Sequence, residues 1–152
     1  MRRALPIILI ALLSACANDF AAHAERYKQL VAAPTPSHWK PGAIWTFVIA
    51  DHYGNKLNSL TFRISQDAAV TCSSGDWRKL ELVEGKLGDG SVPLQAAYSV
   101  EGRALSLDLT GWCDVGGITG ELLDHTFAGR STGGPVSGDS HSANQVKGWR
   151  VK

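Results

Sequence analysis

Apolar and polar residues alternate with a period of two along most of the chain after residue 42. In residues 42–51 the alternation puts Trp45, Phe47 and Ile49 on one side, with Thr46 and Val48 on the other. A period of two is typical of a half-buried β-strand, because successive side chains of a strand point to opposite faces. We therefore expect strands within residues 42–51, 60–65, 76–85, 98–100, 105–110, 116–123, 126–130 and 145–152.

Short polar or glycine-containing segments separate these expected strands. Gly54-Asn55 and Glu101-Gly102 are turn signals, Asp124-His125 lies at a hairpin tip, and residues 131–144 form a Gly/Ser-rich loop. Consecutive strands joined this closely are antiparallel, and a long antiparallel sheet usually closes on itself to remove its edges. The pattern predicts an all-β domain, an antiparallel up-and-down barrel of seven or eight strands, with a β-sandwich as the second choice.

A different period precedes the barrel. Between residues 20 and 31 apolar residues recur at intervals of three and four, which predicts a short helix. The residues on this helical face are Phe20, Ala24, Tyr27, Leu30 and Val31. We expect the helix to pack on the barrel as a lid, with a membrane-surface or partner-binding segment as the alternative. Three prolines between residues 31 and 42 then predict an extended linker.

The first 15 residues have the layout of a secretory signal peptide. Arg2 and Arg3 are followed by an apolar run over residues 4–13 and by the small residues Ser14 and Ala15. The apolar run is about half of the ~20 residues that a helix needs to span a bilayer, so we do not expect a transmembrane anchor.

The stretch Leu-Ser-Ala-Cys at Leu13–Cys16 resembles the lipobox of bacterial lipoproteins. The resemblance implies that Cys16 carries a diacylglycerol and becomes the first residue after removal of residues 1–15. By the same resemblance, Ala17 after the cysteine favours sorting to the outer membrane. The expected organisation is a signal peptide (1–15), a lipidated segment with the linker (16–42) and the barrel domain (43–152). The alternative is an ordinary secretion signal with an incidental cysteine.

The chain has three cysteines, and lipidation of Cys16 would leave Cys72 and Cys113 as partners for each other. Exported proteins meet an oxidising compartment in which thiols tend to pair, so we expect a Cys72–Cys113 disulfide. Two separate buried thiols are the alternative. A CxxC motif is absent from the sequence, which argues against a redox or zinc role for either cysteine.

Charge and composition narrow the class of partner. The chain has 15 basic and 14 acidic residues without a basic run, which argues against nucleic-acid binding. The 16 glycines, most of them in the second half, favour turns and closely packed strands over helices.

Residue types that could support catalysis occur only in settings that favour a structural role. Asp139-Ser140-His141 has the residue types of a hydrolase triad but lies in the Gly/Ser-rich loop, whereas a triad is held on rigid elements. Asp51-His52 and Asp124-His125 are neighbours at strand ends, where adjacent side chains point apart. The five histidines have neither HxH nor HExxH spacing, and the glycines of Gly116–Glu121 lack the helix and lysine of a phosphate loop. We expect no catalytic residues, no metal and no cofactor.

The tryptophans are the best candidates for contacts with a ligand or partner. Trp45, Trp77, Trp112 and Trp149 lie on expected strands or at their ends, and Trp39 lies in the linker. Most should fill the core, because aromatic side chains bury large apolar areas, and the remainder could line a pocket or contact a partner. We expect the indole of Trp112 to pack near the disulfide.

The Gly42–Trp45 entry followed by a meander of hairpins resembles the calycin barrels, the lipocalins and avidins, in architecture only. These observations predict a non-enzymatic outer-membrane lipoprotein, anchored to the membrane through Cys16, whose barrel binds a protein partner in the envelope. Small exported β-barrel inhibitors of enzymes have a similar architecture. The alternatives are a lipocalin-like carrier of a small apolar ligand and an assembly accessory of an envelope complex.

Overall fold

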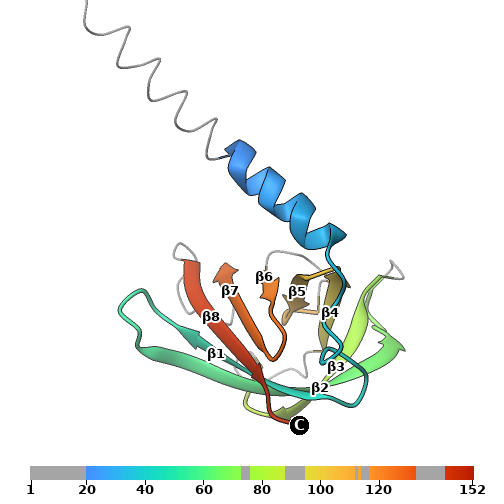
Figure 1. Cartoon of the computed structure of the whole chain (residues 1–152). Helices are drawn as coiled ribbons and strands as arrows, with labels where there is room; N and C mark the ends of the chain where they lie inside the picture. Colours follow the sequence, from blue (N-terminus) through green and yellow to red (C-terminus); the bar gives the residue numbers. More distant parts are fainter. Residues whose placement is uncertain (1–19, 73–75, 88–94, 112, 114–116, 133–142) are drawn as a thin grey trace, which may run out of the picture.

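The structure of the protein is a computed structural model that describes residues 20–72, 76–87, 95–111, 113, 117–132 and 143–152. In this part of the chain a helix of residues 20–32 precedes a barrel of β-strands (Figure 1). The strands are β1 (Ile44–Ala50), β2 (Lys56–Ala68), β3 (Arg78–Glu84), β4 (Ala96–Glu101), β5 (Ala104–Asp108), β6 (Ile118–Leu122), β7 (Thr126–Thr132) and β8 (Ala143–Arg150).

Each strand pairs with the next one along the chain in antiparallel orientation, and β8 pairs with β1 to close the barrel. The structure thus confirms the predicted up-and-down barrel, with eight strands, and not the sandwich. Closure gives β1 and β8 a partner on both sides, so the first and last strands of the meander leave no free edge where they meet.

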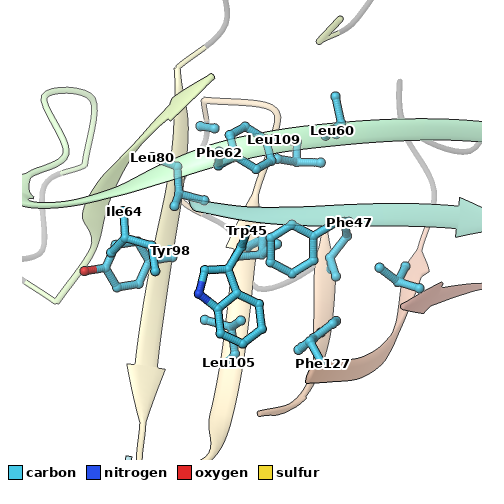
Figure 2. Packing of buried hydrophobic residues seen from close by; sticks show 14 of the residues in the cluster. Trp45, Phe47, Leu60, Phe62, Ile64, Leu80, Tyr98, Leu105, Leu109 and Phe127 are labelled. Carbon is cyan, nitrogen blue, oxygen red and sulfur yellow. The ribbon is translucent and has the colours of Figure 1, made fainter. Parts of the chain in front are cut away.

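Large apolar side chains fill the barrel interior. Trp45, Phe47 and Ile49 all point inward from β1 and are fully buried, as the alternation predicts. Figure 2 shows the rings of Trp45, Phe47 and Phe127 close together among other buried side chains of the barrel. The buried cluster comprises Trp39, Ala43, Trp45, Phe47, Ile49, Leu60, Phe62, Ile64, Leu80, Leu87, Ala96, Tyr98, Leu105, Leu107, Leu109, Ile118, Leu122, Phe127 and Val146.

Three glycines at inward positions make room for the largest rings. A Cβ on Gly148 would lie 2.7 Å from the ring of Phe47, and a Cβ on Gly120 would lie 2.7 Å from the ring of Phe127. Gly129 likewise faces the ring of Phe127. Large side chains on β1 and β7 are therefore matched by missing side chains on β6, β7 and β8, which allows close packing without strain.

Trp39 belongs to this core, although its proline-rich surroundings predict a linker position. A turn in which the Trp39 N–H donates to the Pro36 carbonyl (3.0 Å) carries the chain inward. The indole is 7% exposed, and its ring centre lies 5.2 Å from that of Trp45 and 5.3 Å from that of Tyr98. The linker contains turns at residues 37–38 and 41–42, and it contributes the Trp39 side chain to the barrel core.

The N-terminal helix stands on the turn between β4 and β5 (Figure 1). The Arg103 N–H donates to the Leu30 carbonyl (2.8 Å), and a Cβ on Gly102, whose φ is +60°, would collide with the carbonyl oxygens of Leu30 and Val31. Residues 20–29 remain exposed, and Phe20 is 78% exposed. The helix is therefore not the close-packed lid that its apolar face predicts. Its last turn is bonded to the β4–β5 turn, and Arg26 in its middle is bonded to Glu121 on β6 (2.7 Å).

Leu82 also departs from the alternation, which predicts an inward position beside Leu80. Leu80 is buried, but Leu82 is 41% exposed. The β3–β4 ladder runs only from Arg78 to Leu80, so the described part of β4 offers no neighbour to cover Leu82. A side chain on a strand is buried when the neighbouring strand has a residue paired opposite it. Leu82 has no such partner in the described part of β4.

Candidate functional site

The four tryptophans that the sequence suggests as contact residues differ in position and burial. Trp45 is completely buried in the barrel interior and its Nε1–H donates to the His38 carbonyl (3.3 Å). Trp77 is buried on the outside of the barrel, Trp149 is 42% exposed on β8, and Trp112 lies outside the described residues. Of the three that the structure describes, Trp149 is the one available to a partner.

A disulfide joins Cys72, in the β2–β3 connection, to Cys113, in the β5–β6 connection, with Cα atoms 5.5 Å apart. The structure thus supports the predicted pairing. Both cysteines pack against a second apolar cluster formed by Ala69, Trp77 and Ala97. Ala97 points outward, because its neighbours on β4 belong to the interior core, so the disulfide and Trp77 cover the outer wall of β4.

Asp108 lies under this cover, next to Ala97 in the β4–β5 ladder, and is almost completely buried. Its carboxylate accepts hydrogen bonds from the Thr110 N–H (3.1 Å), the Thr110 hydroxyl (2.7 Å) and the Cys113 N–H (2.7 Å). A carboxylate removed from water is costly unless its oxygens accept hydrogen bonds, and hydrogen bonds to a carboxylate are among the stronger ones in proteins. Asp108 therefore holds the backbone of Thr110 and Cys113 in place, and Cys113 is the partner of Cys72 in the disulfide.

Two histidines and an arginine meet where the linker crosses the end of the barrel. The rings of His38 and His125 stack with centres 3.8 Å apart, and Arg150 Nη1 lies 2.8 Å from His38 Nδ1. Because arginine can only donate, His38 Nδ1 accepts this bond and the imidazole is neutral. Burial, followed by the neighbouring His125 and Arg150, holds the pKa of His38 below its usual range; Lys40 acts in the same direction and Asp124 opposes them.

Because the pKa of His38 is lowered in the folded protein, we expect the protein to lose stability under mildly acidic conditions. The unfolded chain takes up a proton at His38 near pH ~6.5, whereas the folded chain resists protonation until its lowered pKa is reached. The free energy of unfolding should therefore fall as the pH drops from ~6.5 toward that lowered pKa. Urea unfolding at a series of pH values measures the effect.

The control for this experiment is His38→Phe, which keeps a ring against His125 but cannot be protonated. In that variant the slope of stability against pH in the same window should become smaller. An unchanged slope would contradict the assignment of the effect to His38.

The other candidate acid–base pairs have structural roles in their turns. The Asp51 carboxylate accepts from the backbone N–H groups of Tyr53 (2.9 Å) and Asn55 (2.8 Å) and from the Asn55 side chain (2.9 Å). These bonds, the Asn55 side chain first, lower the pKa of Asp51. Asp124 forms an ion pair with Arg103 (3.8 Å). Asp139-Ser140-His141 lies outside the described residues.

Within the described ranges, no group of three or more His, Cys, Asp or Glu side chains is arranged to hold a metal ion. In the same part of the chain, no helix combines the length and apolar character needed to cross a membrane.

Three exposed apolar residues lie at the end of the barrel where β6 and β8 end and β7 begins. Trp149 is the Cα partner of Thr126, whose carbonyl accepts from the Leu123 N–H (2.8 Å), and Val151 is two residues beyond Trp149. Leu123, Trp149 and Val151 are all more than a third exposed. We refer to these three residues as the Trp149 face. Contiguous exposed apolar surface frequently marks an interaction site.

The fold and this surface define a closed eight-stranded antiparallel barrel with a filled interior and an exposed tryptophan on its outer wall. Comparison with protein-family models, with curated proteins and with solved structures gives no match for the chain.

Proposed function

We propose that the protein is a lipid-anchored, non-enzymatic binding protein of the bacterial outer membrane, and that its barrel binds a protein partner in the envelope. The observation that carries the proposal is the contrast between the two sides of the barrel wall. Inside, aromatic and branched side chains pack against one another. Outside, large apolar side chains remain exposed on the Trp149 face.

The filled interior supports a protein partner over the carrier alternative. A lipocalin-like carrier holds its ligand inside the barrel, which needs an interior wide enough to leave a cavity. Here Trp39, Trp45, Phe47 and Phe127 occupy that space, with ring centres of neighbouring pairs 5.2–6.5 Å apart. A rigid, filled barrel suits a protein that presents its surface, as a small exported inhibitor does.

The Trp149 face has the composition of a protein contact. Exposed tryptophan is enriched among the residues that contribute most to binding between proteins, and the surrounding apolar side chains exclude water from the contact. Lys147, on the same side of β8 as Trp149, supplies a charged rim.

Photo-crosslinking in intact envelopes tests this proposal. A benzophenone amino acid placed at Lys147 should form a discrete adduct with one partner protein, because Lys147 adjoins the Trp149 face. The same amino acid at Tyr53, on the β1–β2 turn and 80% exposed, is the matched control and should give little of that adduct. Adding Trp149→Ala should reduce the Lys147 adduct by about tenfold. Loss of one hot-spot residue weakens binding by ~1.4 kcal/mol or more, which corresponds to this factor.

Equal adducts at Lys147 and Tyr53, or an adduct that survives Trp149→Ala, would contradict the Trp149 face as the contact. A stoichiometric membrane complex in place of a soluble partner would favour the assembly-accessory alternative. The intact mass of the bait tests the anchor separately: the proposal expects loss of residues 1–15 and an acylated Cys16, and an unmodified thiol there would overturn the localisation.

A further inference from the structure

A groove of about 600 Å³ lies between the N-terminal helix and the outer wall of β5, β6 and β7. His23, Arg26, Tyr27 and Leu30 line its helix side, at the spacing of three and four residues that places side chains on one helical face. This volume falls within the range of small-molecule sites, ~300–1,000 Å³.

The floor of the groove is flat because its side chains are small. Outward-facing Ala104, Ser106, Thr119 and Ala128 contribute to it, together with the bare backbone of Gly120 and Gly129. Both glycines face the ring of Phe127 on the inner side of the wall, which leaves no space for a Cβ there. Tyr27, Leu30, Ala104 and Ala128 give the groove its apolar surface.

The separation between helix and barrel is set by specific contacts. Arg26 Nη2 donates to both oxygens of the Glu121 carboxylate, at 2.9 and 2.7 Å, which ties the middle of the helix to β6. At the base, Thr35 donates to the Gly102 carbonyl (2.8 Å), and the Gly102 backbone touches the end of the helix. The groove is therefore held open between two attachment points.

Among the described residues that line the groove, one arginine has no carboxylate partner. Glu121 is the carboxylate that lines it, and Arg26 already neutralises that group. Arg130, on β7, has no ion-pair partner among the described residues and lies at the side of the same groove. A guanidinium beside a mainly apolar trough is complementary to an elongated apolar ligand with an acidic end.

An extended peptide is a poor match for this floor. Peptides that lie on sheets usually add a strand to a free edge through main-chain hydrogen bonds. Strands β5, β6 and β7 are each paired on both sides, so their backbone groups are already occupied. An occupant of the groove must bind through apolar contact and charge.

We propose that this groove is a binding site for a single-chain anionic amphiphile of the fatty-acid type. Its carboxylate would pair with Arg130, and its acyl chain would lie between Tyr27 and Leu30 of the helix and Ala104 and Ala128 of the wall. The site is outside the barrel and is separate from the partner contact proposed at Trp149.

Calorimetric titration with dodecanoate tests the proposal on the full chain, made by cell-free synthesis under oxidising conditions without membranes. Saturable binding at one site is expected. Arg130→Gln should weaken it by roughly fivefold to tenfold, the effect of losing one partly solvated charged contact. Ala128→Phe should abolish binding, because the new ring occupies the trough. Dodecyltrimethylammonium, which has the same tail and the opposite charge, should bind at least about tenfold more weakly.

Arg63→Gln is the matched control, because Arg63 is also an outward arginine of the barrel wall but pairs with Glu81 (3.4 Å) away from the groove. Its affinity for dodecanoate should equal that of the unmodified chain. If Ala128→Phe fails to fold, as judged by circular dichroism, Thr119→Phe on the neighbouring strand fills the same trough. Absence of saturable binding, equal binding of the cationic amphiphile, or unchanged binding with the groove filled would each overturn the proposal. Phosphatidylglycerol vesicles that capture the unmodified and Ala128→Phe chains equally would also overturn it, in favour of a bilayer surface.

Discussion

Replacing Trp39 with alanine is expected to lower the free energy of unfolding by about 3–5 kcal/mol. The indole is almost completely buried and contacts Trp45, Phe47 and Tyr98. Its removal would leave a cavity at the end of the barrel that the rigid strands cannot close. Because a domain of this size is stable by only about 5–15 kcal/mol, the variant would lose a large fraction of its stability.

Urea unfolding followed by tryptophan fluorescence and circular dichroism measures this loss. Trp39→Phe is the control: it keeps a ring in the core and removes an indole Nε1–H that is buried without a hydrogen-bond partner in the described part of the chain. The phenylalanine variant should therefore lose much less stability than the alanine variant. If Trp39→Ala lowers the free energy of unfolding by less than about 1 kcal/mol, the Trp39 side chain does not contribute substantially to the barrel core.

The double variant Cys72→Ser/Cys113→Ser is expected to lose about 4 kcal/mol of stability by the chain-entropy account of cross-links. The two cysteines lie 41 positions apart, so the disulfide removes many conformations from the unfolded chain. It also fastens Trp77 over the outer wall of β4, and loss of the bond would expose this second cluster.

Thermal and urea unfolding of the double variant, compared with the oxidised parent, measures the effect. Cys16→Ser is the control, because it leaves the disulfide intact and should unfold with the midpoint of the parent. Equal destabilisation by Cys16→Ser and by the double variant would contradict the division into one lipid site and one structural pair.

The strands could be predicted from sequence because their burial pattern is local. In β1, in residues 60–64 of β2 and in β5, every second residue is large and apolar, and those residues point into the barrel. Short turns between consecutive strands predicted that neighbouring strands are antiparallel. Closure of the sheet was expected because unpaired edge strands are unfavourable. Leu82 shows the limit of this reasoning, since its exposure depends on where β4 stops pairing with β3.

Contacts between distant segments could not be predicted in the same way. The proline content of residues 34–41 indicates an extended chain, but nothing local indicates that Trp39 turns inward to meet Trp45 and Tyr98. The stack of His38 on His125 joins residues of two connections that have no sequence relation to each other. The groove likewise depends on Arg26 finding Glu121 on β6.

The sequence by itself determined the alternation that builds the barrel, the helical period before it and the pairing expected of Cys72 and Cys113. These depend on the spacing of residues along the chain and on the chemistry of each side chain. Only the tertiary structure decided which tryptophan is exposed, that the linker fills the barrel end, and that a groove lies outside the wall. Those outcomes depend on which surfaces meet after folding, because burial of a side chain is a property of its neighbours in space.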